Sequence, residues 1–317
     1  MFIPSAFWRL KAREALKGQW LTALLIALAV NLPSLLVQGI AAVTGNDLLS
    51  RFTELVMGSM VGSGSTVSVD PAALTRGVDE LRQSAGIWVF QGLNVAAWLL
   101  TPCLTLGMVA WLLSRLRKQE AGNVTAVFSR IGLFFKAIGL RLYVLWRMFV
   151  WMLPGIALSI LAVLVPLWLS NQSSSISRLS AVNTSLGLQS AAMIATAVLG
   201  VIGWVRYALS DMVLADRPER GPVQAAKESR KLTDGKKGTL FSLYLSFLLW
   251  YLVQMAAASL AADLLGSVAG LMVDMLAGLA LSVYVTASVT AFYLGCRAAD
   301  PADMKAPAAE TEEGTEI

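Results

Sequence analysis

Residues 20–43 read WLTALLIALAVNLPSLLVQGIAAV and contain no charged side chain. A helix needs about 20 apolar residues to cross the hydrocarbon core of a bilayer, and this stretch of about 24 residues is long enough. Four basic residues precede it, Arg9, Lys11, Arg13 and Lys17. Basic residues before an apolar run also mark a signal peptide, but this run is too long for one and further apolar runs follow. We therefore predict an uncleaved first transmembrane helix.

Five further stretches have similar length and apolar character: residues 87–113, 146–169, 188–210, 239–261 and 270–295. They must be helices, because lipid cannot satisfy the unpaired backbone amides of an open sheet. The composition agrees, since 56% of the residues are hydrophobic and only 14% are charged, against roughly 25% charged in an average soluble domain. The predicted fold is an all-α, polytopic transmembrane bundle of about six spans.

The basic residues are distributed unevenly between the two sides that these spans define. With the N-terminus inside, 21 of the 25 lysines and arginines lie on the inner side. Cytoplasmic segments carry the excess of basic residues in membrane proteins, so both termini are predicted to be cytoplasmic. The expected regions are an amphipathic N-terminal segment 1–19, a membrane domain 20–296 with an outer loop 44–86 and inner loops 114–145 and 211–238, and a disordered acidic tail 297–317.

The outer segments differ in their expected structure. Apolar residues at helical spacing predict a helix on the membrane surface over residues 46–57. Asp70 followed by Pro71 resembles the start of a second, polar helix that ends near residue 84. The Ser-rich segment 170–185 is predicted to lack regular structure.

We find no catalytic, metal or cofactor signature in the sequence. It contains no histidine, the commonest general base and the commonest metal ligand. Cys103 and Cys296 are far apart and lie in or beside apolar runs, which favours two buried thiols over a disulfide. No phosphate-binding glycine loop or nucleophile elbow is present. We expect no cofactor and no enzymatic activity.

Helix-breaking residues near the middle of the spans are candidate functional positions. Asn31 and Pro33 lie in the first span, Pro102 in the second, and Pro154 and Gly155 in the third. Transporters use unwound helix segments of this kind to bind substrates. Proline and glycine are also common in membrane helices, where neighbouring helices satisfy the freed carbonyl groups. Both interpretations, a substrate site and a packing kink, remain open.

Charged residues near the ends of spans are a second group of candidates. Arg206 lies near a cytoplasmic end, and Asp263 and Asp274 lie near the outer turn between the last two spans. Ionisable groups within membranes are costly and often functional, so the two aspartates predict a small cation or proton site. Alternatively, all these side chains reach water or headgroups. We expect no charge in the middle of the bilayer.

The last inner loop carries a basic patch. Lys227, Arg230 and Lys231 share one helical face, and Lys236 and Lys237 follow. The patch predicts contact with anionic lipid headgroups, at about 1 kcal/mol per basic residue. Alternatively, these residues only fix the topology. We expect no nucleic-acid partner, because the patch adjoins the membrane and is interrupted by acidic residues, Asp216, Glu219, Glu228 and Asp234.

Several stretches carry a family resemblance. They are ALKGQW at 15–20, WMLPGI at 151–156, LADRP at 214–218, AAKESRKL at 225–232, GKKG at 235–238 and LSFLLW at 245–250. Together they resemble the bacterial integral membrane proteins grouped as domain of unknown function 975. The resemblance implies a multi-pass protein of the bacterial inner membrane and no known activity.

The sequence departs from that family in one place. In the family, the Pro-Gly-Ile element leads within one helix to the Arg-Tyr element, whereas here about 50 residues separate Gly155 from Arg206. Residues 156–205 therefore form either two full spans or a re-entrant pair.

The sequence supports two functional hypotheses. The leading one is a non-enzymatic protein that organises or regulates a membrane process through contacts with lipid or with an unidentified membrane protein. The alternative is a small-solute transporter or channel built around the helices that proline and glycine interrupt.

Overall fold

The structure is a computed structural model that describes residues 4–44, 60–61, 68–69, 75, 79, 85–119, 124–170 and 175–298. Within these residues, six helices are long and apolar enough to cross a membrane. They are α2 (Trp20–Thr44), α5 (Ala85–Leu116), α6 (Phe134–Ser170), α7 (Ser175–Tyr207), α10 (Lys237–Leu265) and α11 (Ser267–Ala298). The predicted all-α fold and the number of spans are confirmed.

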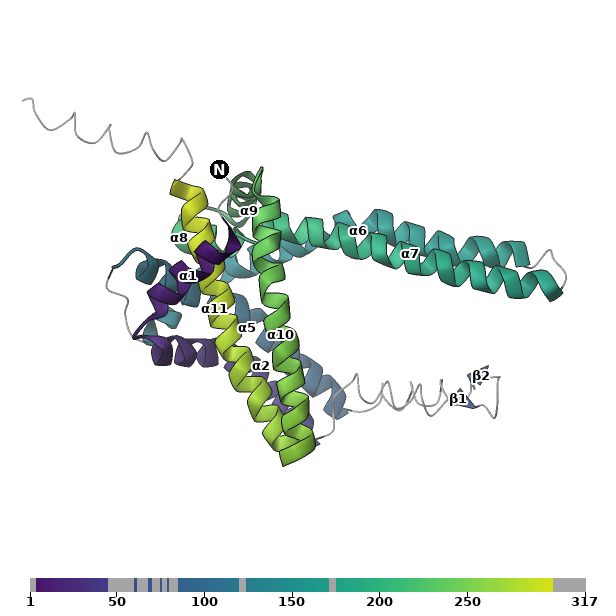
Figure 1. Ribbon diagram of the computed structural model, residues 1–317, viewed down its shortest axis with the longest axis horizontal. Coiled ribbons are helices and arrows are strands. Elements are labelled where there is room, and N and C mark those ends of the chain that lie inside the picture. Colours follow the sequence, from purple (N-terminus) through teal and green to yellow (C-terminus); the bar gives the residue numbers. More distant parts are fainter. Residues whose placement is uncertain are drawn as a thin grey trace, which may run out of the picture.

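Shorter helices gather at one end of the long ones (Figure 1). They are α1 (Ser5–Leu16), the 3-10 helix η1 (Val124–Leu133), α8 (Ser210–Asp216) and α9 (Pro222–Thr233). We call this region the basic end; it also includes the adjoining ends of the long helices at Leu116, Phe134, Tyr207, Lys237 and Ala298.

The predicted outer loop is described only in part. Two-residue strands β1 (Met60–Val61) and β2 (Ser68–Val69) pair antiparallel within it. The helix predicted over residues 46–57 lies outside the described residues. So do most of the polar helix predicted from Asp70 and the tail beyond Ala298.

The long helices pack in pairs. α6 packs against α7, and α10 against α11, while α2 and α5 pack against each other and against α11. The α6–α7 pair extends away from the other long helices (Figure 1). Small residues allow the close pairing: a Cβ on Gly155 of α6 would collide with Thr196 of α7, and one on Gly270 of α11 would lie 2.6 Å from the Cβ of Ala262.

The structure resolves how the middle of the chain folds. Residues 156–170 and 175–205 belong to α6 and α7, which are both long and apolar enough for full spans, and not to a re-entrant pair. The predicted inner loop 114–145 includes the first turns of α6, which begins at Phe134. The prediction that residues 170–185 lack regular structure is wrong from Ser175 onward, where α7 begins. Serine lowers helix stability by only about 0.5 kcal/mol, and a helix that is already formed extends at little further cost.

The outward surfaces of the long helices are apolar. Trp146 of α6, Leu249 of α10 and Leu271 of α11 are 63%, 68% and 67% exposed. Exposed apolar surface on this scale would drive association in water, whereas it is the favourable surface toward lipid. The chain is therefore a multi-pass membrane protein.

Helix α1 lies across α11 at the basic end. Trp8 is 4% exposed and packs edge-on against Phe292, with ring centroids 5.6 Å apart. Its ring fills the space beside Gly295, where a Cβ would collide with it. The hydroxyl of Tyr284 donates a hydrogen bond to the carbonyl oxygen of Arg9 at 3.3 Å. The N-terminal helix is thus a packed part of the bundle.

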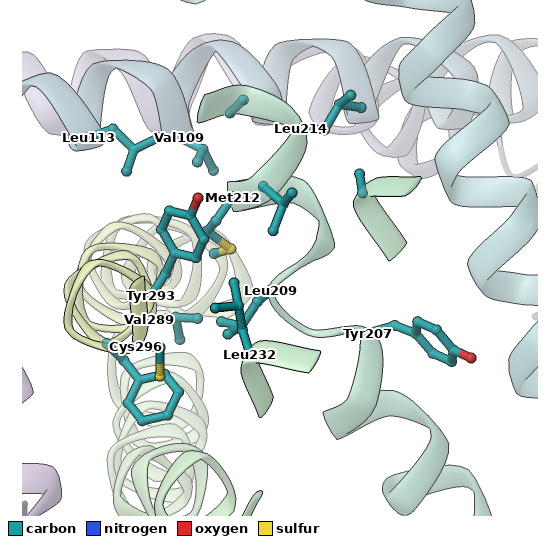
Figure 2. Packing of buried hydrophobic residues seen from close by; sticks show 14 of the residues in the cluster. Val109, Leu113, Tyr207, Leu209, Met212, Leu214, Leu232, Val289, Tyr293 and Cys296 are labelled. Atoms are coloured by element: carbon teal, nitrogen blue, oxygen red, sulfur yellow. The ribbon is translucent and has the colours of Figure 1, made fainter. Parts of the chain in front are cut away.

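The main apolar core lies at the basic end between α8, α9 and the ends of α5 and α11. In α8, residues 212–215 are all apolar and buried. Figure 2 shows Leu209 and Met212 between Val289 and Tyr293 of α11 and Leu232 of α9. Residues 212–215 are buried on every side, which explains why α8 has no polar face between Asp211 and Asp216.

The contact between α5 and η1 generates a first prediction. A Cβ on Gly107 of α5 would lie 2.6 Å from the carbonyl carbon and 2.7 Å from the Cα of Val127 in η1. Gly107→Ala therefore forces η1 away from α5, and we expect a loss of about 1–3 kcal/mol in the free energy of unfolding. The measurement is the midpoint of thermal unfolding in detergent.

Gly92→Ala in the same helix is the matched control, because nothing lies within 4 Å of a Cβ there. Its helix propensity alone should raise stability slightly, by up to about 1 kcal/mol. Equal midpoints for the two variants would contradict the close backbone contact.

Candidate functional site

The carboxylate of Asp216, the last residue of α8, joins three helix ends. Its side chain is only 4% exposed, and its Oδ1 lies 2.7 Å from Nη2 of Arg117, just beyond α5. Its Oδ2 forms an ion pair with Arg297 and accepts a hydrogen bond from the hydroxyl of Tyr293 at 2.8 Å. Both arginines lie at helix C-termini, where a cation also compensates the helix dipole. We call these four residues the Asp216 cluster.

A second carboxylate fixes the turn between α8 and α9. Glu228 of α9 forms ion pairs with Arg217, at 3.4 Å, and with Arg220, both in that turn. The carbonyl oxygen of Pro218 accepts a hydrogen bond from Nζ of Lys136 in the first turn of α6, at 2.7 Å. The turn is therefore tied both to the helix that follows it and to α6.

Helix α9 presents two chemically different faces. The face toward the bundle is buried and consists of Ala225, Ala226, Ser229, Leu232 and Thr233. Oγ of Ser229 donates a hydrogen bond to the carbonyl oxygen of Arg206 at 3.1 Å, satisfying an acceptor in the last turn of α7. On the opposite face Lys227, Arg230 and Lys231 are exposed, and their side chains make no ion pair with any described residue. We call these three residues the basic face of α9.

The other two residues of the predicted basic patch contact the chain itself. Nζ of Lys236 lies 3.5 Å from the carbonyl oxygen of Cys296. Nζ of Lys237 donates a hydrogen bond to Oδ1 of Asp234 at 2.7 Å, and this contact lowers the pKa of the Asp234 carboxyl below its ordinary value. Both lysines therefore use part of their hydrogen-bonding capacity within the protein.

The predicted helix breakers do not interrupt their helices. α2, α5 and α6 are continuous through Pro33, Pro102 and Pro154. Nδ2 of Asn31 donates to a backbone carbonyl one turn earlier in its own helix, at 2.8 Å, and Gly155 serves the close contact with α7 described above. Neither the groove between α6 and α7 nor the cavity beside Asp211 is lined by any of these residues.

The charged residues predicted as candidate sites, Arg206, Asp263 and Asp274, do not form one site in the structure. The guanidinium of Arg206 lies over the ring of Trp151, with Cζ 4.5 Å from the centroid, an attractive cation–π geometry. Oδ1 of Asp274 accepts a hydrogen bond from Nε2 of Gln254 at 2.9 Å. Asp263 is exposed near the far end of α10, and no described contact joins it to Asp274. The described part of the chain contains no cluster of three potential metal ligands.

Asp211 is a candidate functional residue that the sequence did not predict. It is the second residue of α8 and lines a cavity of about 420 Å³ between α5, α6, α7, α8, α10 and α11. The fourth span is predicted to end at Ser210, which assigns Asp211 to a solvated loop. The available signal was the apolar run that continues over residues 212–215, because it keeps the chain inside the packed core.

Comparison with known proteins gives one match. The profile of the family described as "Protein of unknown function (DUF975)" matches residues 4–300. The matched region includes α1, α8, α9 and the six long helices. No curated protein and no solved structure matches the chain.

The Asp216 cluster generates a second prediction. Asp216→Asn keeps the shape of the side chain but leaves Arg117 and Arg297 without their shared counter-charge. Removing one partner of a buried ion pair costs about 3 kcal/mol or more, so we expect a large fall in the unfolding midpoint in detergent. Asp234→Asn is the control, because Asp234 is 76% exposed and should matter little. Equal effects would show that Asp216 does not join the helix ends.

Proposed function

The chain belongs to the family described as protein of unknown function DUF975, and from the chemistry of its basic end we propose that it binds anionic lipid headgroups through the basic face of α9. In this proposal it is a non-enzymatic, multi-pass protein of the bacterial inner membrane. Its role is to organise or regulate a membrane process through lipid and protein contacts.

The observation that carries this proposal is the arrangement of α9. Its buried face fixes the helix against the bundle, so that Lys227, Arg230 and Lys231 are presented together. Each basic residue near an anionic membrane surface contributes about 1 kcal/mol of attraction. Three such residues on one rigid face are therefore sufficient to hold headgroups beside α9.

Three of the four acidic residues near this face are paired within the chain, and the fourth, Glu219, is exposed in the turn before α9. Asp216 is neutralised within its own cluster, and Glu228 by Arg217 and Arg220. Asp234 is paired with Lys237. The positive charge of the basic face is therefore left available for a partner outside the chain.

The shape of the bundle supports the proposed orientation. α1, α8, α9 and the described end of α11 all lie at the basic end (Figure 1). The excess of lysine and arginine thus lies on one side of the six long helices. Because basic segments are retained on the cytoplasmic side, the basic end is expected to face the cytoplasm.

The alternative, a small-solute transporter built around broken helices, has less support. Its candidate residues Asn31, Pro102 and Pro154 lie on three continuous helices and line neither of the two cavities described above. Each proline leaves one carbonyl group of the preceding turn without its helical hydrogen bond, but none of the three helices is unwound there in the way that transporters use to bind substrates.

Lipid retention tests the proposal. The triple variant Lys227→Gln, Arg230→Gln, Lys231→Gln removes the basic face, and native mass spectrometry measures phosphatidylglycerol retained by the purified protein. At about 1 kcal/mol per residue, each substitution should weaken binding roughly fivefold. The wild-type protein should retain phosphatidylglycerol in preference to phosphatidylcholine.

A matched triple variant, Lys11→Gln, Arg13→Gln, Lys17→Gln, removes the same charge from α1 at the same end of the bundle. It should retain more phosphatidylglycerol than the α9 variant. Unchanged retention of phosphatidylglycerol in the α9 variant would contradict the proposal. An equal loss in both variants would assign the effect to net charge instead of to the face of α9.

Cysteine labelling tests the orientation. In a chain carrying Cys103→Ala and Cys296→Ala, a membrane-impermeant maleimide should label Lys231→Cys only after the cells are permeabilised. Asp263→Cys, at the opposite end, should be labelled in intact cells. Both residues are exposed, so accessibility within the protein is matched. The reverse labelling pattern would overturn the proposed topology.

A further inference from the structure

The cavity lined by Asp211 lies where the α6–α7 pair meets the other long helices. Its volume of about 420 Å³ is within the range of roughly 300–1,000 Å³ typical of small-molecule sites. Tyr244, one of its walls, is seven residues from the start of α10, about 10 Å at 1.5 Å per residue. Thr286, on another wall, is twelve residues from the end of α11, about 18 Å. The cavity therefore lies within the spanning helices, in the half nearest the basic end.

Two opposite charges face this cavity without pairing. Asp211 of α8 and Arg141 of α6 both line it. They form no ion pair with each other, and neither side chain has a hydrogen-bond or ion-pair partner among the described residues. Charges inside a membrane protein are costly unless a counter-charge or water meets them. The cavity thus presents both an anionic and a cationic group to a ligand.

Aromatic rings lie beside the carboxylate. Trp204, Tyr207 and Tyr244 line the same cavity. The rings of Trp204 and Tyr244 have centroids 4.3 Å apart and planes inclined at 56°. Tyr207 belongs to the same buried apolar cluster as Leu209, and its hydroxyl, on the side of the ring away from Leu209 (Figure 2), accepts a hydrogen bond from Nε of Arg147 at 3.2 Å. Aromatic faces next to a carboxylate are the chemistry that recognises an ammonium group.

The other residues that line the cavity offer no further polar group to a ligand beyond the charged and aromatic side chains described above. The hydroxyls of Thr105 and Thr286 donate to carbonyl oxygens in their own helices, at 2.8 and 2.7 Å. Val109, Met148 and Val289 supply apolar surface. A ligand that fits therefore carries charged groups and also has an uncharged part that tolerates apolar contact.

We propose that this cavity binds a zwitterion. Its ammonium group lies between the carboxylate of Asp211 and the rings of Trp204 and Tyr244, and its phosphate or carboxylate group meets Arg141. The ligand can be the headgroup of an ethanolamine phospholipid that enters from the bilayer, or a soluble zwitterion. This site is separate from the basic face of α9, whose proposed ligands are anionic lipids.

Calorimetric titration of the full-length protein in detergent tests the site with two soluble probes. Glycerophosphoethanolamine carries both charges, whereas glycerophosphoglycerol has a second glycerol in place of the ethanolamine and carries no ammonium group. We expect the first probe to bind at least tenfold more tightly than the second. Measurable binding of both probes with equal affinity would overturn the proposal.

Variants then assign the contacts. Asp211→Asn should weaken binding of glycerophosphoethanolamine at least tenfold, whereas Asp211→Glu should retain this binding. Arg141→Gln should also weaken the binding, and its unfolding midpoint should stay near that of the wild type. Asp263→Asn is the control, an exposed aspartate far from the cavity, and should bind like the wild type. Full binding by Asp211→Asn would overturn the proposal, and if that variant does not fold, the comparison of the two probes on the wild-type protein decides.

A lipid-retention experiment shows whether the ligand comes from the bilayer or from solution. Native mass spectrometry measures phosphatidylethanolamine retained from nanodiscs by the wild type and by Asp211→Asn, which should retain less. Retention of this lipid without binding of the soluble probe supports a ligand from the bilayer, and binding of the soluble probe supports a soluble zwitterion. Absence of both would overturn the proposal. Loss of the α9 basic face should leave this binding unchanged, which separates the two proposals.

Discussion

The carboxylate of Asp216 is the contact on which the arrangement of the basic end depends. It lies almost fully out of water and meets two guanidinium groups and a phenol, so its charge is compensated where the local dielectric constant is low. Through it the ends of α5, α8 and α11 converge on one point. α8 is fixed as a result, and with it both the wall of the cavity that carries Asp211 and the turn that leads into α9.

Lipid offers no hydrophobic drive for helices to associate, because the acyl chains are as apolar as the side chains. The long helices are held instead by close contact and by polar links at their ends. Because Gly155 has no Cβ, Thr196 can pack directly against it, and the backbone of Val127 packs against Gly107 in the same way. These contacts need small residues at particular positions, which explains why glycine in this chain is more than a helix breaker.

The sequence was sufficient to predict the six spanning helices, whose length the bilayer sets, and the basic face of α9, which follows from helical spacing. Six apolar stretches predicted six helices because a spanning segment has a fixed minimum length. The basic face of α9 followed from the spacing of Lys227, Arg230 and Lys231. The partners of Asp216 did not follow, because Arg117 and Arg297 are distant in the chain and meet it only in the folded bundle. Asp211 was missed because a single charge beside a predicted span end resembles a loop residue.

The docking of α1 on α11 has a consequence for biosynthesis. Trp8 is synthesised before all six long helices, whereas Phe292 and Gly295, against which it packs, lie in the last of them, α11. A chain inserted span by span therefore has no binding surface for α1 until α11 is in place. Until then every partly inserted intermediate carries an undocked amphipathic segment, which the membrane surface or an insertion factor must shield.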